Sequence, residues 1–354
     1  MINLYDLSRD ELESLLKEWG EPKYRAQQLY NWLYEHRVDN FDDMSNLPQS
    51  LRENLIEKTV LGTLNLVTEQ VSNDGTVKRL FKLNDGQLIE SVLMPYDDHR
   101  RTACISSQAG CAMGCVFCAT GQMGFARNLT ATEIFEQAMR FSRELEAKGE
   151  RLSNVVLMGM GEPFHNYDAV MEAIRRLMSE LGIGQRHITV STVGLVPQIR
   201  KFADEGLQLT LAISLHKADD DERSALMPVN KRWNLLELVG ACRYYTEKTN
   251  RRVTFEWAAI AGENDTPEEA HKLGKLLKTL HCHVNIIPLN PTGGYAGKPS
   301  DSGAIDEFIE ILESHGVSAT VRVRRGIDID AGCGQLKSNV IDAKTIKTQK
   351  SKRL

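Results

Sequence analysis

The chain has 354 residues and a formal net charge of −5, with 42% hydrophobic and 26% charged residues. This composition is typical of a globular protein, and the length fits one large domain and a smaller one. The negative charge excludes a protein that coats nucleic acid through bulk positive charge, and no apolar run is long enough to span a bilayer.

The ends of the chain and its cysteines indicate a reducing compartment. The first residues lack the apolar stretch of a signal peptide, and the last carry no lipidation motif. We therefore expect a cytoplasmic protein with no membrane partner. Of the seven cysteines, Cys104, Cys111, Cys115 and Cys118 lie close together in the sequence, which indicates metal or redox chemistry rather than a disulfide scaffold.

Residues 1–60 are predicted to form a small helical domain. Apolar residues recur at helical spacing in 10–19 and 24–36, and Gly20 and Pro22 separate the two stretches. The lysines and arginines in this part make it a candidate accessory contact for RNA.

Residues 61–95 change to the period of strands. The runs 77–83 and 88–94 are flanked by turn signals, Asn-Asp-Gly in both cases. A short β-meander that links two larger parts is the simplest interpretation.

From residue 96 to residue 340 we predict a catalytic domain in which strands and helices alternate. Strands are expected at 102–107, 154–158, 187–191, 209–215, 253–260, 283–288 and 318–323. Helices are expected at 131–147, 168–181, 196–205, 235–249, 267–280 and 305–315. Repeated βα units predict a parallel sheet, and six units are too few for an eight-stranded barrel. The fold class is therefore α/β, with a partial (βα)6 barrel.

Several basic positions are candidate contacts for RNA phosphates, with an ordinary solvated surface as the alternative for each. Residues 341–354 are predicted to be a basic tail. The candidates are Arg100, Arg101, Arg322, Arg324, Arg325, Lys344, Lys347, Lys350, Lys352 and Arg353.

The most specific motif is a loop with three cysteines, Cys111-Ala-Met-Gly-Cys115-Val-Phe-Cys118. It follows the first predicted barrel strand at its carboxyl end, where active sites of βα barrels gather. Three thiolates at this spacing can bind a [4Fe-4S] cluster and leave the fourth iron without a protein ligand. That iron can chelate S-adenosylmethionine (SAM), and electron transfer then gives a 5′-deoxyadenosyl radical. The alternative is a structural zinc site with a fourth ligand from elsewhere, although such sites usually pair their ligands at longer separations.

The chain resembles the RlmN-type dual-specificity RNA methyltransferases of the radical SAM superfamily over essentially its whole length. The markers beyond the cysteine loop are the segments 106–111, 158–163, 191–194, 214–216, 287–291 and 326–336. The family usually has Ala where Gly332 stands, a departure that is expected to loosen the loop around Cys333. The resemblance implies a radical SAM fold, a [4Fe-4S] cluster on Cys111, Cys115 and Cys118, and two SAM molecules per methylation.

The same resemblance implies roles for residues that follow predicted strands. The implied SAM contacts are Gly161, Glu162, Ser191, Ser214, Leu215, His216 and Asn290. Glycines let the backbone approach a ligand closely, and the Glu162 carboxylate suits the SAM ammonium group. The alternatives are an ordinary βα turn for the glycines and satisfied polar groups at a sheet edge for the rest.

Three further residues are implied to carry the chemistry. Cys333 is the methyl acceptor that forms an S-methylcysteine intermediate, and Cys104 is the resolving thiol that forms a transient disulfide with it. Glu90 is the proton acceptor, with an ordinary surface strand residue as the alternative. Cys242 and Cys282 are interpreted as structural.

The implied reaction is methylation of C2 of an adenosine in 23S rRNA, before ribosome assembly, and of the adenosine next to the anticodon in tRNA. A flipped or single-stranded base is required, and an electron donor such as flavodoxin is the expected protein partner. Two hypotheses remain beside it: methylation of C8 of the rRNA adenine, which confers antibiotic resistance, and a zinc-stabilised RNA-binding module without catalysis.

Overall fold

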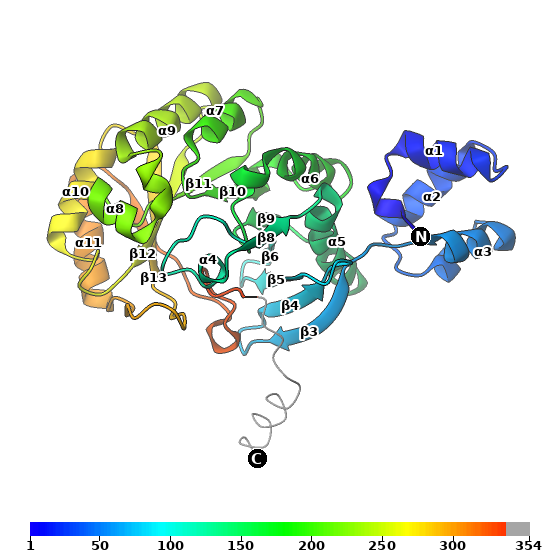
Figure 1. Cartoon of the computed structure of the whole chain (residues 1–354), viewed down its shortest axis with the longest axis horizontal. Helices are drawn as coiled ribbons and strands as arrows, with labels where there is room; N and C mark the ends of the chain where they lie inside the picture. Colours follow the sequence, from blue (N-terminus) through cyan, green and yellow to red (C-terminus); the bar gives the residue numbers. More distant parts are fainter. Residues whose placement is uncertain (338–354) are drawn as a thin grey trace, which may run out of the picture.

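The computed structural model describes residues 1–337, and Figure 1 traces their elements in chain order. The predicted basic tail and the last three residues of the predicted catalytic domain lie outside the described residues. No helix within residues 1–337 combines the length and the apolarity needed to cross a membrane.

The N-terminal part contains three helices: α1 (Arg9–Glu18), α2 (Tyr24–Tyr34) and α3 (Gln49–Lys58). The first two match the predicted helical stretches, whereas α3 is an additional helix. Strands β1 (Ile2–Asn3) and β2 (Thr59–Val60) pair in parallel, so the two ends of this part meet. Figure 1 shows it in blue, beside α5.

One ten-stranded sheet organises the rest of the molecule. Its strand order is β14-β13-β12-β11-β10-β9-β6-β5-β4-β3. The strands are β3 (Asn65–Val71), β4 (Val77–Lys82), β5 (Leu88–Pro95), β6 (Arg101–Cys104), β9 (Asn154–Leu157), β10 (Ile188–Thr192), β11 (Thr210–Ser214), β12 (Val253–Ala259), β13 (Cys282–Pro288) and β14 (Ala319–Val321). The seven strands from β6 to β14 pair in parallel, as the βα alternation predicts.

The predicted meander is part of this sheet rather than a separate linker. Strands β3, β4 and β5 are antiparallel, and β5 pairs with the first parallel strand β6. A pairing between β5 and β6 brings Val92 opposite Cys104, so the meander forms one wall beside the candidate site.

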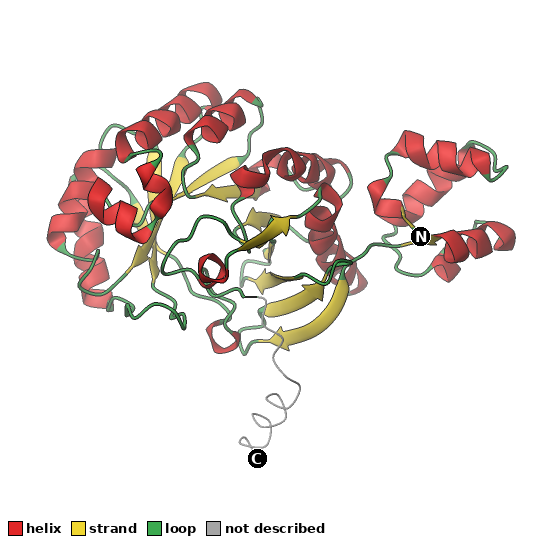
Figure 2. Ribbon diagram, viewed as in Figure 1, coloured by secondary structure: helices red, strands yellow, loops and turns green. Residues whose placement is uncertain are grey.

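The connecting helices cover the outside of the sheet, as Figure 2 shows. They are α5 (Ala131–Ala147), α6 (Tyr167–Ser179), α7 (Val196–Asp204), α9 (Leu235–Thr249), α10 (Pro267–Leu277) and α11 (Ser302–Ser314). Helix α5 begins at the capping box of Thr130 and Glu133, in which each side chain bonds the other residue's backbone N–H. Shorter elements that the sequence did not predict are α4 (Ala119–Met123), α8 (Asp220–Leu226) and the hairpin of β7 (Gln108–Gly110) and β8 (Phe125–Asn128).

Candidate active site

The three-cysteine loop lies inside the β7–β8 hairpin, at the carboxyl ends of the parallel strands. Cys111 follows β7 directly, and Cys118 is the residue before α4. Burial raises the pKa of the Cys111 thiol to about 12 and that of Cys115 well above its usual range. In the protein without ligands these thiols therefore hold their protons, and a bound cation is needed to favour the thiolates.

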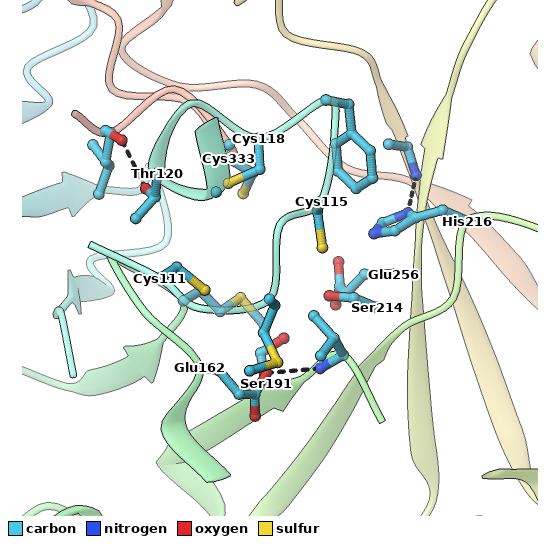
Figure 3. Close-up of a pocket in the computed structure, with 18 of the residues that line it drawn as sticks. Cys111, Cys115, Cys118, Thr120, Glu162, Ser191, Ser214, His216, Glu256 and Cys333 are labelled. Carbon is cyan, nitrogen blue, oxygen red and sulfur yellow. Dashed lines mark hydrogen bonds between the residues drawn. The ribbon is translucent and has the colours of Figure 1, made fainter. Parts of the chain in front are cut away.

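One large cavity collects most of the predicted site residues, as Figure 3 shows for part of its lining. It encloses about 1100 Å³, counting the part open to solvent. The predicted residues that line it are Cys111, Cys115, Cys118, Gly161, Glu162, Ser191, Ser214, His216, Asn290 and Cys333. These residues lie in or after strands that are far apart in the sequence, and the parallel sheet brings them together.

The donor set in this cavity fits an iron–sulfur cluster and SAM. Within residues 1–337 no three His, Cys, Asp or Glu side chains are close enough to hold a single metal ion. The three thiols instead stand around the cavity wall, and thiolates are the usual ligands of such clusters. The side-chain oxygen Asn290 Oδ1 is buried without a hydrogen-bond partner and belongs to a residue that lines the same cavity, so it is available to a bound polar ligand.

Glu162 is a buried carboxylate at the end of β9. Its Oε1 accepts the N–H of Phe164 at 3.0 Å, and its Oε2 accepts that of Val193 at 2.9 Å. Burial nevertheless raises the pKa of Glu162 to about 7, because desolvation outweighs these two bonds. A ligand ammonium group would favour the ionised form.

The glycines beside Glu162 line the large cavity and are also required by the packing around them. A Cβ at Gly159 would lie 2.7 Å from the carbonyl of Ile105, and one at Gly161 would lie 2.5 Å from Cβ of Gln108. Gly161 also has φ +103, which favours glycine. These residues let the end of β9 pack tightly against the chain that leads to the cysteine loop.

His216 offers an N–H group to the cavity. Its Nδ1 accepts the backbone N–H of Ala258 at 2.9 Å, so the proton of the neutral ring is on Nε2. Burial lowers the pKa of His216 to about 3, which keeps the ring neutral. The neighbouring Leu215 does not line the cavity, because its side chain lies in the core and its backbone bonds Glu256 and Arg223.

Two charged residues in the cavity wall were not assigned to a site from the sequence. Glu256 in β12 accepts from Asn285 Nδ2 at 3.0 Å, and its Oε2 lies 3.5 Å from Nη1 of Arg322. A lone acid in the apolar run of β12 was the available signal for Glu256. Arg322, a candidate for a basic surface patch, instead turns inward and lines this cavity.

Cys333 lies where this cavity meets a second one. Its backbone carbonyl accepts from Asn290 Nδ2 at 3.0 Å, and the next carbonyl, of Gly334, accepts the N–H of Ala119 at 2.8 Å. The second cavity, about 540 Å³ including its open part, is lined by both Cys333 and Cys104. Cys104 is buried, which raises the pKa of its thiol to about 12.

Glu90 lines neither cavity. Its Oε1 lies 3.5 Å from Nζ of the buried Lys78, and its Oε2 accepts the backbone N–H of Lys337 at 2.9 Å. Burial is the largest influence on Glu90 and raises its pKa, although Lys78 acts in the opposite direction. Lys337 directly follows Leu336, which lines both cavities together with Cys333. The bond to Lys337 therefore places the Glu90 carboxylate next to the loop of Cys333. Cys242 and Cys282 are buried in α9 and at the start of β13, away from both cavities.

Comparisons with known proteins identify the family of this chain. The sequence matches the ribosomal RNA large subunit methyltransferase N-terminal domain over residues 2–61 and the radical SAM superfamily over residues 105–274. It is 54% identical to the dual-specificity RNA methyltransferase RlmN 1 of Myxococcus xanthus, over 96% of this chain and 95% of that protein. It is 48% identical to the probable dual-specificity RNA methyltransferase RlmN of Halalkalibacterium halodurans, over 95% of this chain and 93% of that protein.

A solved structure gives the same result. The crystal structure of a radical SAM methyltransferase from Sphaerobacter thermophilus matches with a TM-score of 0.91 and 48% identity, over 96% of this chain and 100% of that one. The hypothesis of a zinc-stabilised module without catalysis is therefore wrong. The chain has the radical SAM fold of a SAM-dependent RNA methyltransferase, and it belongs to the RlmN family of dual-specificity RNA methyltransferases.

Proposed function

We propose that this enzyme methylates C2 of one adenosine in the peptidyl-transferase centre of 23S rRNA, before ribosome assembly, and C2 of the adenosine next to the anticodon in tRNA. The relatives are named as dual-specificity RNA methyltransferases, which supports two classes of RNA substrate, and the family of the N-terminal domain is named for large-subunit ribosomal RNA. We further propose that the enzyme acts in the cytoplasm and that a protein such as flavodoxin supplies the electron for cleavage of SAM.

The cofactors are a [4Fe-4S] cluster and SAM, and the radical SAM family supports both. We infer that Cys111, Cys115 and Cys118 hold the cluster and that the polar residues of the large cavity hold SAM. These are Gly161, Glu162, Ser191, Ser214, His216 and Asn290. Leu215 has no side chain in the cavity, so any contribution is indirect. When bound, these groups supply a methyl group and a hydrogen-abstracting radical, at a cost of two SAM molecules per methylation.

The observation that carries the proposal is the position of Cys333 at the junction of the two cavities. From there its sulfur can accept a methyl group on the side of the large cavity and present the methyl carbon to a base in the second cavity. Direct attack by C2 of adenine on a sulfonium is unfavourable because C2 is electron-poor. A carbon carried by Cys333 avoids this difficulty.

Glu90 and Cys104 complete the reaction from the other side of Cys333. Glu90, whose Oε2 accepts the backbone N–H of Lys337, takes the C2 proton. Cys104, in the wall of the second cavity, forms a bond with the Cys333 sulfur as the bond between that sulfur and the methyl carbon breaks. The methylene carbon left on the base takes up a proton and so becomes the methyl group, the adduct gives up one electron to the cluster, and the disulfide of Cys104 and Cys333 is reduced by an external thiol before the next turnover.

Methylation of C8 is the alternative, since it would use the same residues. Incubation with SAM, a reductant and unmodified 23S rRNA or tRNA, followed by mass spectrometry against C2- and C8-methyladenosine standards, distinguishes the two. We expect C2-methyladenosine from both RNAs. If C8-methyladenosine were the only product, the proposed position of methylation would be wrong. If rRNA were methylated and tRNA were not, the proposal of tRNA as a second substrate would be wrong.

A further inference from the structure

The second cavity has a wall with positive charge only. Three arginines line it, Arg322, Arg324 and Arg325, and no acidic residue does. Arg322 is balanced by Glu256, whose Oε2 lies 3.5 Å away. Arg324 and Arg325 form no ion pair within residues 1–337. Arg325 Nε is moreover buried without a hydrogen-bond partner, so this guanidinium has an unused donor.

A fourth arginine, Arg100, contacts this wall through the ring of Tyr96. The Arg325 guanidinium lies 4.8 Å from the centre of the Tyr96 ring, and the Arg100 guanidinium lies 4.7 Å from it. Tyr96 itself lines the second cavity. Arg100 is already paired with Asp98 at 2.7 Å, so Arg324 and Arg325 are the two cations whose charge is not balanced. Cation–π contact with the ring fixes the Arg325 guanidinium at the cavity wall.

We propose that Tyr96, Arg324 and Arg325, which we call the arginine rim, bind the RNA backbone beside the target adenosine, and that the second cavity is the entrance through which the base reaches Cys333. The inference rests on the proposed role of Cys333. Guanidinium groups pair with phosphate oxygens through two parallel hydrogen bonds, and phosphate contacts fix the position of a nucleic acid. A base that reacts inside a cavity must leave its stack, which brings its own phosphates to the mouth.

An acidic electron-donor protein is the other class of partner that such a rim would attract. The lining favours RNA, because the second cavity contains Cys104 and Cys333 but none of the three loop cysteines. A donor protein must instead approach the cysteine loop, which lines only the large cavity.

The test measures RNA binding at several salt concentrations. Arg324→Ala, Arg325→Ala and the double variant are titrated into a fluorescently labelled tRNA anticodon hairpin. We expect each single variant to bind roughly tenfold more weakly, as the loss of one charge-assisted hydrogen bond predicts. We also expect the slope of log affinity against log salt to fall by about 0.7 for each arginine removed. Tyr96→Leu should weaken binding like Arg325→Ala, and Tyr96→Phe should not.

The chain offers a matched control outside both cavities. Tyr244 also has two cations over its ring, with the Arg200 guanidinium at 5.3 Å and Lys248 Nζ at 5.4 Å. Arg200→Ala and Tyr244→Leu should leave affinity and salt slope unchanged. Weakened SAM binding in the rim variants, or slower reduction by flavodoxin with unchanged RNA binding, would overturn the inference. The inference would also be overturned if the double variant showed the same slope of log affinity against log salt as the parent protein. Failure of the proposed role of Cys333 is recognised separately, as absence of a methyl group on that residue by peptide mass analysis.

Discussion

Glu162 illustrates how one buried residue ties stability to pH. Its pKa in the folded protein is about 7, above the ordinary value of 4.5. Below pH 4.5 the carboxyl is protonated in both the folded and the unfolded chain. As pH rises through 7 the unfolded chain releases this proton first, so folding becomes less favourable by about 3 kcal/mol in total.

Glutamine does not titrate, so the Glu162→Gln variant should lack this part of the pH dependence of folding stability. Urea unfolding of both proteins without SAM, at pH 5 and pH 8, measures the difference. We expect the parent to lose about 2.5 kcal/mol more stability than the variant between the two values, because a small part of the loss has already occurred at pH 5. An equal loss in both proteins would show that Glu162 is ionised in the fold throughout this range.

Lys78 is the buried partner of Glu90 and lowers its pKa against the effect of burial. Replacing the cation by Met should raise the pKa of Glu90, because the ionised carboxylate loses its nearest opposite charge. A proton acceptor must be ionised, so the acid limb of the pH–rate profile for RNA methylation should move to higher pH. At neutral pH the rate should fall roughly tenfold. An unmoved acid limb would contradict the role of Glu90.

At the scale of elements, the loops differ in how they tolerate an added methyl group. A Cβ at Gly332 would meet the amide of Asn290 and Oε1 of Gln335, both at 2.7 Å, and both are ends of flexible side chains. A Cβ at Gly159 would meet the backbone of Ile105 at the same distance. The backbone of Ile105, which follows β6 and accepts the N–H of Gly159, cannot move away, whereas side-chain ends can.

Gly332→Ala should therefore change the free energy of unfolding by less than about 1 kcal/mol, and Gly159→Ala should lower it by roughly 2 kcal/mol or more. Urea unfolding of the two variants checks this contrast. Equal destabilisation would mean that the Cys333 loop is as rigid as the end of β9. The expected loosening by Gly332 is not evident in the loop's contacts, because Asn290 occupies the space and bonds the Cys333 carbonyl.

The sequence predicted elements with strong local signals and missed those that depend on distant partners. Helix α5 has its predicted bounds because a capping box starts an amphipathic run. Strand β3 was missed, since its side chains are mostly exposed and show no buried face. The pairing of β5 with β6 is invisible locally, because a hairpin period does not tell which strand lies next to it.

In the candidate site, too, residues in local motifs were predicted from the sequence, and contacts between distant segments were not. Cys111 was recognised from the spacing of the three cysteines after a predicted strand, and the resemblance implied the role of Glu162. The contacts of Glu90 with Lys78 and Lys337 were not predictable, since they join β4, β5 and the last described loop. Nor was the meeting of Arg100 and Arg325 at Tyr96, more than two hundred residues apart in the chain.

At the scale of the whole molecule, Glu136 of α5 joins the N-terminal part to the sheet. Its carboxylate is 1% exposed and accepts the backbone N–H groups of Thr63 and Leu64 at 2.8 and 3.1 Å. These residues connect β2 to β3. Glu136→Ala leaves the buried donor of Leu64 and the half-buried donor of Thr63 without partners, so it should lower the free energy of unfolding by about 2–4 kcal/mol.

Hydrogen exchange at residues 62–64, together with urea unfolding, checks this expectation. Glu144 on the same helix provides the control, because its carboxylate is 44% exposed and its partner Arg79 also pairs with Glu69. Glu144→Ala should cost less than about 1 kcal/mol. Equal costs for the two variants would mean that Glu136 does not hold the junction.

The central claim is that Cys333 carries the methyl carbon to the base and that Cys104 releases the product. Incubation of Cys104→Ala with SAM, a reductant and tRNA, followed by a denaturing gel, tests it directly. We expect a slowly migrating, ribonuclease-sensitive band in which peptide mass analysis finds RNA attached at Cys333, and no such band from the double variant with Cys333→Ala. Cys242→Ala, which removes a thiol buried away from both cavities, should give none either. Efficient turnover by Cys104→Ala without an adduct would contradict the account.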